Sequence, residues 1–337
     1  MINKDNSVIS NKKTVVACDL FLNLDLYHVP GWLQEFLKVA FPNIEIVPVN
    51  TPNSQKTNRG ATVYWGNRIT MKMIHDMPNL KWIHFGSVGV NRVNVEKLME
   101  KGITVTSSKG LVVSSMVASA LAFMTSLARG LHYSQFLRNK GEMSREKFDI
   151  YFDHIHELSN ETCLIVGFGD VGRRLLKICN ALEMNVSVIR RSKEKVDLVD
   201  KSYTLEQILD AVSRADYIVN LLPLTKKTKG IFTREVFNNM KKGSFFINIG
   251  RGETVEEDSL IEVLKNEHLS GAGLDVFENE PLAQNSPLWK MENVLLSPHV
   301  AGLSKGYWDR QADLFVHNLE YHLKGKESLM RNIVKTN

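Results

Sequence analysis

Short apolar runs alternate with segments of helical periodicity through the first third of the chain. Such runs, rich in β-branched and aromatic side chains, predict strands. The predicted strands are Thr14–Cys18, Ile44–Val49, Ala61–Trp65, Leu80–Phe85 and Ile103–Val105. Helical spacing appears between some of them, at Trp32–Ala40 and Val95–Lys101. This alternation predicts a parallel sheet with helices on both of its faces.

A second and longer alternating series begins at residue 164. Its six predicted strands are Leu164–Val166, Val186–Ile189, Tyr217–Leu221, Phe245–Asn248, Ala272–Asp275 and Val294–Ser297. Helical spacing separates several of them, at 172–182, 205–214, 233–240 and 256–266. Six strands with crossover helices are typical of a dinucleotide-binding sheet.

Three further segments complete the pattern. Leu111–Leu131 has helical spacing and is apolar over most of its surface, as in helices buried in a core or in a subunit interface. Gly141–Leu158 is polar with interspersed aromatic residues and predicts an excursion over the surface. Tyr307–Leu323 predicts a final amphipathic helix.

Length and patterning together predict two α/β domains. A chain of 337 residues suffices for two domains of roughly 150 residues each. We expect residues 109–302 to form the cofactor-binding domain, and residues 1–108 with 303–337 to form the substrate-binding domain. Both domains are expected to be Rossmann-like or flavodoxin-like with parallel sheets, and catalysis is expected in a cleft between them.

Composition narrows the class of protein. The net charge of +5 comes from scattered lysines and arginines, which argues against nucleic-acid binding. No apolar run approaches the roughly 20 residues that span a bilayer, and the polar N-terminus lacks the apolar centre of a secretion signal. Cys18, Cys163 and Cys179 indicate neither a disulfide framework nor a metal site. We therefore expect a cytoplasmic protein without bound metal.

The first strand of the second series ends in a glycine-rich turn. Gly167, Gly169 and Gly172 form the pattern G-x-G-x-x-G, with Asp170 and Val171 inside it, between an apolar strand and a helical segment. In that context the first glycine permits a tight turn, the second admits a pyrophosphate, and the third lets helix and strand pack closely. The positive end of the helix dipole also favours phosphate. We expect a dinucleotide to bind here.

The residues after the next predicted strand indicate which dinucleotide binds. Arg190, Arg191 and Ser192 stand where an acidic residue would favour NAD, and Arg190 follows Gly167 by 23 positions. Guanidinium groups and a hydroxyl suit a 2′-phosphate. The alternative is a pair of solvated arginines in a loop. We predict NADP(H) as the preferred cofactor, with NAD(H) possible.

Candidate chemical groups follow the last three strands of this series. Arg251, Asp275, Glu280 and His299 lie beyond the carboxyl ends of those strands, where such sheets bind ligands. Each also has a simpler interpretation. Arg251 can bond loop carbonyls, Glu280 can be a solvated loop acid, and Asp275 can cap a turn. His299, at a strand end after a proline, is the strongest catalytic candidate.

Several motifs carry a family resemblance that runs from about residue 80 to residue 302. They are Val166–Gly172, Leu222–Thr225 with Thr228, Asn248–Gly252, Leu274–Pro281 and Ser297–His299. In these motifs the chain resembles the D-isomer-specific 2-hydroxyacid dehydrogenases. The Arg-Arg-Ser segment and Ser286–Trp289 look most like the NADPH-using glyoxylate and hydroxypyruvate reductases.

The resemblance implies an activity and its residues. Arg251, Glu280 and His299 occupy the family's catalytic positions, and the implied reaction is NADPH-dependent reduction of a small 2-oxo acid to the D-2-hydroxy acid. The resemblance also implies a homodimer and contact between Asp275 and the nicotinamide carboxamide. Further cofactor-binding positions implied by it are Leu222, Pro223, Thr228, Ile249, Gly250, Arg251, His299 and Gly302.

The chemistry assigns a role to each group. His299 can donate a proton near neutral pH, and Glu280 beside it would orient the ring and favour its charged form. Arg251 suits a substrate carboxylate and carbonyl. The backbone N–H groups of Val88 and Gly89 can bind the remaining carboxylate oxygen. Tyr64 and Trp65 either line the substrate entrance or, more simply, pack in a core.

Two departures from the family pattern and a rival function remain. Relatives carry Ala-Glu where this chain has Ala118-Ser119, and Gly-x-Asp where it has Gly89-Val90-Asn91. A nucleotide-sensing corepressor of the same fold could retain the same catalytic residues without turnover. A role like that of formate dehydrogenase is less consistent with the sequence, because that branch carries glutamine where this chain has Glu280.

Overall fold

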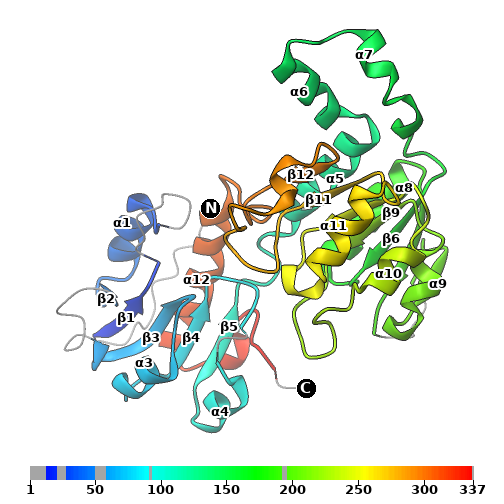
Figure 1. The fold of residues 1–337 in the computed structure, drawn as a ribbon. Helices are drawn as coiled ribbons and strands as arrows, with labels where there is room; N and C mark the ends of the chain where they lie inside the picture. The colour runs from blue at the N-terminus through cyan, green and yellow to red at the C-terminus, as the bar shows by residue number, and fades with distance from the viewer. Residues whose placement is uncertain (1–12, 21–27, 50–57, 91–92, 192–195, 336–337) are drawn as a thin grey trace. The chain divides into compact units, whose positions relative to one another are not determined.

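The computed structural model describes residues 13–20, 28–49, 58–90, 93–191 and 196–335. The chain divides into two compact units, one of residues 1–111 with 304–337 and one of residues 112–303. Each unit contains one parallel β-sheet, and Figure 1 shows both sheets with their helices. The predicted α/β fold with two parallel sheets is confirmed.

The first unit contains a five-stranded sheet in the order β2-β1-β3-β4-β5. Its strands are β1 (Thr14–Cys18), β2 (Ile44–Pro48), β3 (Ala61–Gly66), β4 (Trp82–Phe85) and β5 (Thr104–Ser107). Its helices are α1 (Gly31–Ala40), α3 (Met71–Asp76), α4 (Val95–Glu100) and α12 (Tyr307–Leu323), followed by the 3₁₀ turn η5 (Glu327–Leu329). Alternate residues of β1 enter two cores. Val16 packs with α1 and α12, and Ala17 packs with α3 and α4.

The second unit contains a seven-stranded sheet in the order β12-β11-β10-β9-β6-β7-β8. Its strands are β6 (Thr162–Val166), β7 (Asn185–Ile189), β8 (Lys201–Tyr203), β9 (Tyr217–Asn220), β10 (Phe245–Asn248), β11 (Gly271–Leu274) and β12 (Val294–Leu296). Its α-helices are α5 (Val113–Ala128), α6 (Leu131–Lys140), α7 (Arg145–Asp149), α8 (Asp170–Ala181), α9 (Ile208–Val212), α10 (Arg234–Asn239) and α11 (Glu257–Lys265). Its 3₁₀ turns are η1 (Phe152–His154), η2 (Leu205–Gln207), η3 (Gly252–Thr254) and η4 (Pro287–Lys290).

The helices of the second unit cover both faces of its sheet. Leu164 and Val166 of β6 pack with α9, α10 and α11, whereas Cys163 and Ile165 pack with α5 and α8. Figure 1 shows α9, α10 and α11 on one side of this sheet. Burial on both faces explains why these strands are continuously apolar in sequence.

The elements that were not predicted from the sequence include the helix α3 and the strand β8. The helix α3 is only six residues long, and it begins where the Thr70 hydroxyl accepts a hydrogen bond from the N–H of Met73. The strand β8 is a three-residue edge strand with two exposed positions. Neither is long enough to show an apolar period.

The prediction of one long helix over Leu111–Leu131 is wrong. The helix α5 ends at Ala128, and the chain turns through Gly130, whose φ is +60°, into α6. A Cβ atom at Gly130 would lie 2.9 Å from the rings of Phe148 and Tyr151, so glycine is required both for the conformation and for the packing.

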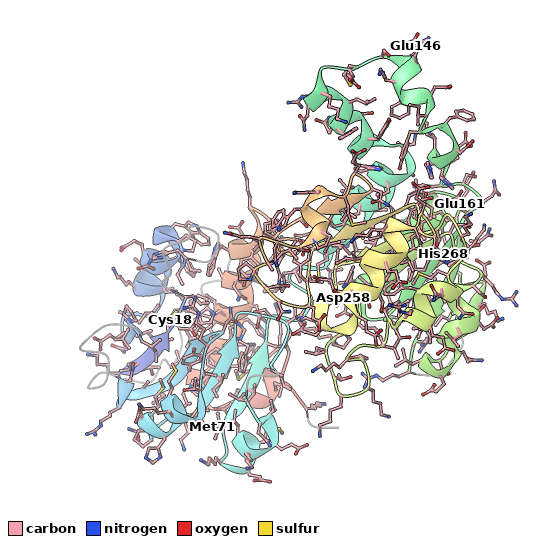
Figure 2. The ribbon with its side chains drawn as sticks, in the orientation of Figure 1. Cys18, Met71, Glu146, Glu161, Asp258 and His268 are labelled. Carbon is pink, nitrogen blue, oxygen red and sulfur yellow. The ribbon has the colours of Figure 1, made fainter. Side chains whose placement is uncertain are left out.

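The helix α5 is also not buried on all sides. Ser114, Ala118 and Ala122 are exposed along one face, at intervals of one helical turn. After α6 the predicted excursion contains α7, which is capped by the Ser144 hydroxyl accepting from the N–H of Lys147 at 3.2 Å. Residues 131–154, which contain α6, α7 and η1, form an arm of the second unit, and Figure 2 shows the labelled Glu146 of α7 on it.

The three cysteines and the helices of the described residues show neither disulfides nor a membrane-spanning segment. Cys18, Cys163 and Cys179 are buried and free, and Figure 2 labels Cys18 in the first unit. Among the described residues, no helix combines the length and the hydrophobicity that a bilayer crossing requires.

Candidate active site

The strands of the second unit end in one row. Ile189, Val166, Asn220, Asn248, Leu274 and Leu296 are successive Cα partners across β7, β6, β9, β10, β11 and β12. All predicted site segments of this unit follow that row by a few residues. Carboxyl ends of parallel strands meet at one edge, so these segments form one ligand-binding edge of the sheet.

The glycine loop after β6 has the geometry that a pyrophosphate requires. Gly167 has φ +101°, and a Cβ atom there would lie 3.0 Å from the carbonyl carbon of Leu221. A Cβ atom at Gly172 would lie 2.9 Å from the oxygen of Gly167. No atom lies within 4 Å of the corresponding position at Gly169, which leaves open space in front of that backbone. Asp170 and Val171 then begin α8. The loop therefore fits a dinucleotide.

Arg190 and Arg191 follow β7 directly. The backbone N–H of Arg190 donates to the oxygen of Tyr203 in β8 at 3.0 Å, which fixes where the strand ends. The Arg190 guanidinium lies 5.8 Å from the ring centre of Phe168, inside the glycine loop. Arg191 is exposed. Arg190 thus lies beside the glycine loop and Arg191 follows it in the chain, whereas Ser192 lies outside the described residues.

Two neighbouring loops complete the cofactor edge. A Cβ atom at Gly250 would lie 2.9 Å from the oxygen of Leu222, so the loops after β9 and β10 are in close contact. Buried Thr228 donates from its hydroxyl to the oxygen of Pro223 at 2.6 Å and thereby closes the loop after β9. Ile249 is buried beside Gly250. Thr228 shapes the loop here, and its contact with a cofactor remains a proposal.

His299 and Glu280 form a pair at this edge. His299 Nδ1 lies 2.7 Å from Glu280 Oε2, and the two side chains are 49% and 35% exposed. An ionised carboxylate only accepts hydrogen bonds, so Nδ1 of His299 carries the proton and Nε2 is the other reactive nitrogen. The φ of His299 is +56°, an uncommon conformation that the loop must impose. The prediction that Glu280 lies beside His299 is met in this geometry.

Asp275 holds the loop that carries His299. Its buried carboxylate accepts hydrogen bonds from the N–H groups of Val300 and Ala301, each at 2.9 Å, and from the Ser297 hydroxyl at 2.5 Å. Its backbone oxygen accepts from the N–H of His299 at 2.8 Å. Asp275 therefore caps this turn, the simpler of its two interpretations.

Arg251 bonds a loop carbonyl, as its simpler interpretation expects, and Ser119 makes a contact that the sequence did not indicate. Arg251 is half-buried, and one N–H of its guanidinium donates to the oxygen of Gly250 at 2.6 Å. A guanidinium has five N–H donors, so this bond occupies one of them. The Ser119 hydroxyl donates to the oxygen of Ala301 at 3.3 Å. Ser119 thus also supports the His299 loop, close to Gly302.

The first unit supplies the predicted carboxylate-binding loop after β4. Val88 and Gly89 are exposed, and the Ser87 hydroxyl donates to the oxygen of Gly89 at 2.9 Å. Tyr64 and Trp65 are fully buried, so they are core residues and do not line an entrance. Burial, and after it the Asp19 carboxylate to which the Tyr64 hydroxyl donates, raises the pKa of Tyr64. Asn91 lies outside the described residues.

Metal binding has no support in the described part of the chain. Within it, no three histidine, cysteine or carboxylate side chains gather as metal ligands would. The glycine loop, Arg190, Arg191 and the His299–Glu280 pair make up the candidate site.

Comparison with known proteins places the chain among characterised relatives. Residues 121–301 match the family model of the D-isomer-specific 2-hydroxyacid dehydrogenase NAD-binding domain. The chain is 32% identical to a glyoxylate/hydroxypyruvate reductase A of Arabidopsis thaliana, over 77% of this chain and 80% of that protein. It is 29% identical to a glyoxylate reductase of Thermofilum pendens, over 77% of each chain. The TT0316 protein of Thermus thermophilus superposes with a TM-score of 0.81 at 26% identity, covering 96% of this chain and all of the other.

Proposed function

The chain belongs to the D-isomer-specific 2-hydroxyacid dehydrogenases, which are NAD(P)-dependent oxidoreductases, and we propose that it reduces a small 2-oxo acid with NADPH. The proposed substrates are glyoxylate, hydroxypyruvate or acids of similar size, and a chiral product would be the D-2-hydroxy acid. The observation that carries the proposal is the His299–Glu280 pair, at 2.7 Å, on the same sheet edge as the glycine loop.

His299 is the proposed proton donor. NADPH, when bound, supplies the hydride for C2 of the substrate. Glu280 accepts from Nδ1–H of His299, which leaves Nε2 to hold a proton and pass it to the substrate oxygen. Glu280 orients the imidazole ring through its contact with Nδ1, and Asp275 holds the backbone from which the ring projects.

Arg251 and the loop after β4 are the proposed substrate ligands. The Arg251 guanidinium matches the planar carboxylate of a 2-oxo acid, and positive charge near C2 polarises the carbonyl. The backbone N–H groups of Val88 and Gly89 are proposed to bind the second carboxylate oxygen. We propose that the first unit, residues 1–111 with 304–337, binds substrate and that the second unit, residues 112–303, binds cofactor.

The preference for NADPH rests on Arg190 and Arg191. Both follow β7 beside the glycine loop, and no carboxylate that would accept the ribose 2′-hydroxyl stands at either position. Two guanidinium groups suit a doubly negative 2′-phosphate. The other proposed cofactor contacts come from Gly167–Gly172, Leu222, Pro223, Thr228, Ile249, Gly250, Asp275 and Gly302.

We also propose that the protein is a homodimer. The family resemblance predicts it, and two features of the second unit support it. The exposed face of α5 carries small side chains that allow a close approach. The arm that follows exposes Leu131, Met143, Ile150 and Phe152 by 53% to 79%. Light scattering after gel filtration should give twice the mass of the chain.

A substrate panel tests the proposed activity. Purified protein is mixed with NADPH or NADH and with glyoxylate, hydroxypyruvate, pyruvate or a bulkier 2-oxo acid, and loss of the reduced nicotinamide absorbance is followed. We expect turnover with the smallest acids, faster with NADPH, and chiral analysis should find the D product.

The same substrate panel distinguishes the proposed reductase from a nucleotide-sensing corepressor. NADPH binding without turnover on any 2-oxo acid, together with a stable protein partner in a pull-down, would contradict the proposal. That result would favour a nucleotide-sensing corepressor that retains the dehydrogenase fold.

A further inference from the structure

Hydrogen bonds from the final helix, α12, hold the loop after β4 in place. The hydroxyl of Tyr307, in the first turn of α12, donates to the oxygen of Gly86 at 2.5 Å. One turn further along, Gln311 donates from Nε2 to the Tyr307 hydroxyl oxygen at 3.1 Å. A Cβ atom at Gly86 would lie 3.2 Å from Gln311 Nε2, so the loop packs tightly against this helix.

A second contact holds the same loop from the end of β5. The backbone N–H of Ser108 donates to the oxygen of Ser87 at 3.0 Å. The Ser108 hydroxyl lies 2.7 Å from the oxygen of Phe85 and 2.9 Å from Gln311 Oε1. Successive carbonyls at 85, 86 and 87 are thereby all engaged.

Gln311 is the centre of this network. Its side chain is fully buried, and a glutamine in that position costs free energy unless both ends are satisfied. Its carbonyl end faces Ser108 and its amide end faces Tyr307, so the amide orientation follows from the two partners. An apolar side chain would fill the same space in an amphipathic helix, but it would leave Tyr307 without this donor.

His84, the titratable histidine next to Gln311, is uncharged at neutral pH. Beneath Gln311, burial lowers the pKa of His84 to about 3, and its Nδ1 lies 2.8 Å from the Thr106 hydroxyl. The Trp82 indole N–H donates to that same hydroxyl at 2.8 Å. His84 is therefore neutral, and no charged group within the network disturbs the loop.

We propose that Tyr307 and Gln311 are positioning residues that fix the Gly86–Ser87 backbone, so that the N–H groups of Val88 and Gly89 point at a substrate carboxylate. The proposal rests on the proposed function, which assigns those N–H groups to the carboxylate. Val88 and Gly89 are exposed while the contacts behind them are buried. A loop fixed in this way loses less conformational entropy when the anion binds.

Tyr307→Phe removes the hydroxyl and keeps the ring. We expect the KM for glyoxylate, and the inhibition constant of oxalate as a dianionic analogue, to rise about 5- to 10-fold, the range of one lost hydrogen bond. The kcat and the KM for NADPH should stay within about twofold. Tyr321→Phe is the matched control, since it removes a hydroxyl from the same helix far from the loop.

Gln311→Glu removes the amide donor that binds the Tyr307 hydroxyl. The carboxylate cannot donate to Tyr307 and competes with Gly86 for the Tyr307 proton, so the KM for glyoxylate should rise again with the KM for NADPH unchanged. An unchanged KM for glyoxylate in either variant, when it is folded and binds NADPH normally, would overturn the proposal. Absence of turnover in the wild-type protein would instead overturn the proposed function.

Discussion

Buried carboxylates in this protein serve the loops around them. Asp275 has three donors on its two oxygens, and the loop they shape presents His299 with a positive φ. Asp19 plays the same part in the first unit, where the N–H groups of Asn67 and Arg68 donate to it. Charge-assisted bonds of this kind stabilise more than neutral ones. Asp275 would therefore affect catalysis through the placement of His299.

The two arginines after β7 carry a prediction about cofactor preference. Replacing Arg190 and Arg191 together by alanine removes the guanidinium groups proposed to bind the 2′-phosphate. We expect kcat/KM for NADPH to fall about 10- to 100-fold while that for NADH changes little, since two charge-assisted contacts are lost. Initial rates with each coenzyme at saturating glyoxylate measure the ratio. Arg174→Ala, an exposed arginine on α8, is the control. An unchanged ratio would show that the 2′-phosphate binds elsewhere.

At the scale of elements, the central strands of both sheets were predictable because they are buried on both faces. β1 and β10 have the bounds predicted from the sequence, and so does α12. The edge strand β8 and the short helix α3 were missed because neither has a buried apolar run long enough to show a period. The break between α5 and α6 was missed because glycine alone does not show what its Cβ would touch.

Some residues of the candidate site were predicted from the sequence and others were missed. The glycine loop, Arg251, Glu280 and His299 were found because they follow predicted strands within a few residues. Tyr307, Gln311 and Ser108 were missed, since their partners lie about two hundred positions away in the chain. The available signal was that Gln311, a polar residue, takes a buried position of the last helix among apolar residues and Asn318.

The turn at Gly130 carries a prediction about the stability of the arm. Gly130→Ala places a Cβ at positive φ and within 2.9 Å of two aromatic rings, whereas Gly141→Ala meets the same φ penalty with no atom within 4 Å. We expect Gly141→Ala to lower the free energy of unfolding by about 1 kcal/mol and Gly130→Ala to lower it by more. Urea unfolding followed by circular dichroism compares the two. Equal losses would mean that the rings move aside freely.

At the scale of the whole molecule, stability should depend on pH through His84. Burial lowers the pKa of His84 to about 3 in the folded chain, against 6.5 for an exposed histidine. Between pH 6.5 and pH 3 His84 binds a proton in the unfolded chain but not in the folded one. The free energy of unfolding therefore decreases as the pH falls from 6.5 towards 3. The slope from one such group is at most about 1.4 kcal/mol per pH unit. Burial also lowers the pKa of His322, near Trp82, which adds to the background slope.

Urea titrations at pH 7 and pH 5 measure this effect. Four of the five tryptophans lie in the first unit, so their fluorescence reports its unfolding. His84→Gln keeps a polar side chain without a titrating group and should show a shallower loss between the two pH values than the wild-type protein. Identical losses would mean that His84 does not contribute.

The proposed function requires His299 to give a proton to a 2-oxo acid on a protein that has already bound NADPH. The direct measurement compares His299→Gln with the wild-type protein in NADPH binding, by nucleotide fluorescence, and in glyoxylate turnover. His75→Gln, at an exposed histidine on α3, is the control. We expect the NADPH affinity of His299→Gln to stay within about twofold of the wild-type value and its turnover to fall roughly 10²- to 10⁴-fold, the range for a lost general acid. Turnover close to that of the wild-type protein, with NADPH bound, would contradict it.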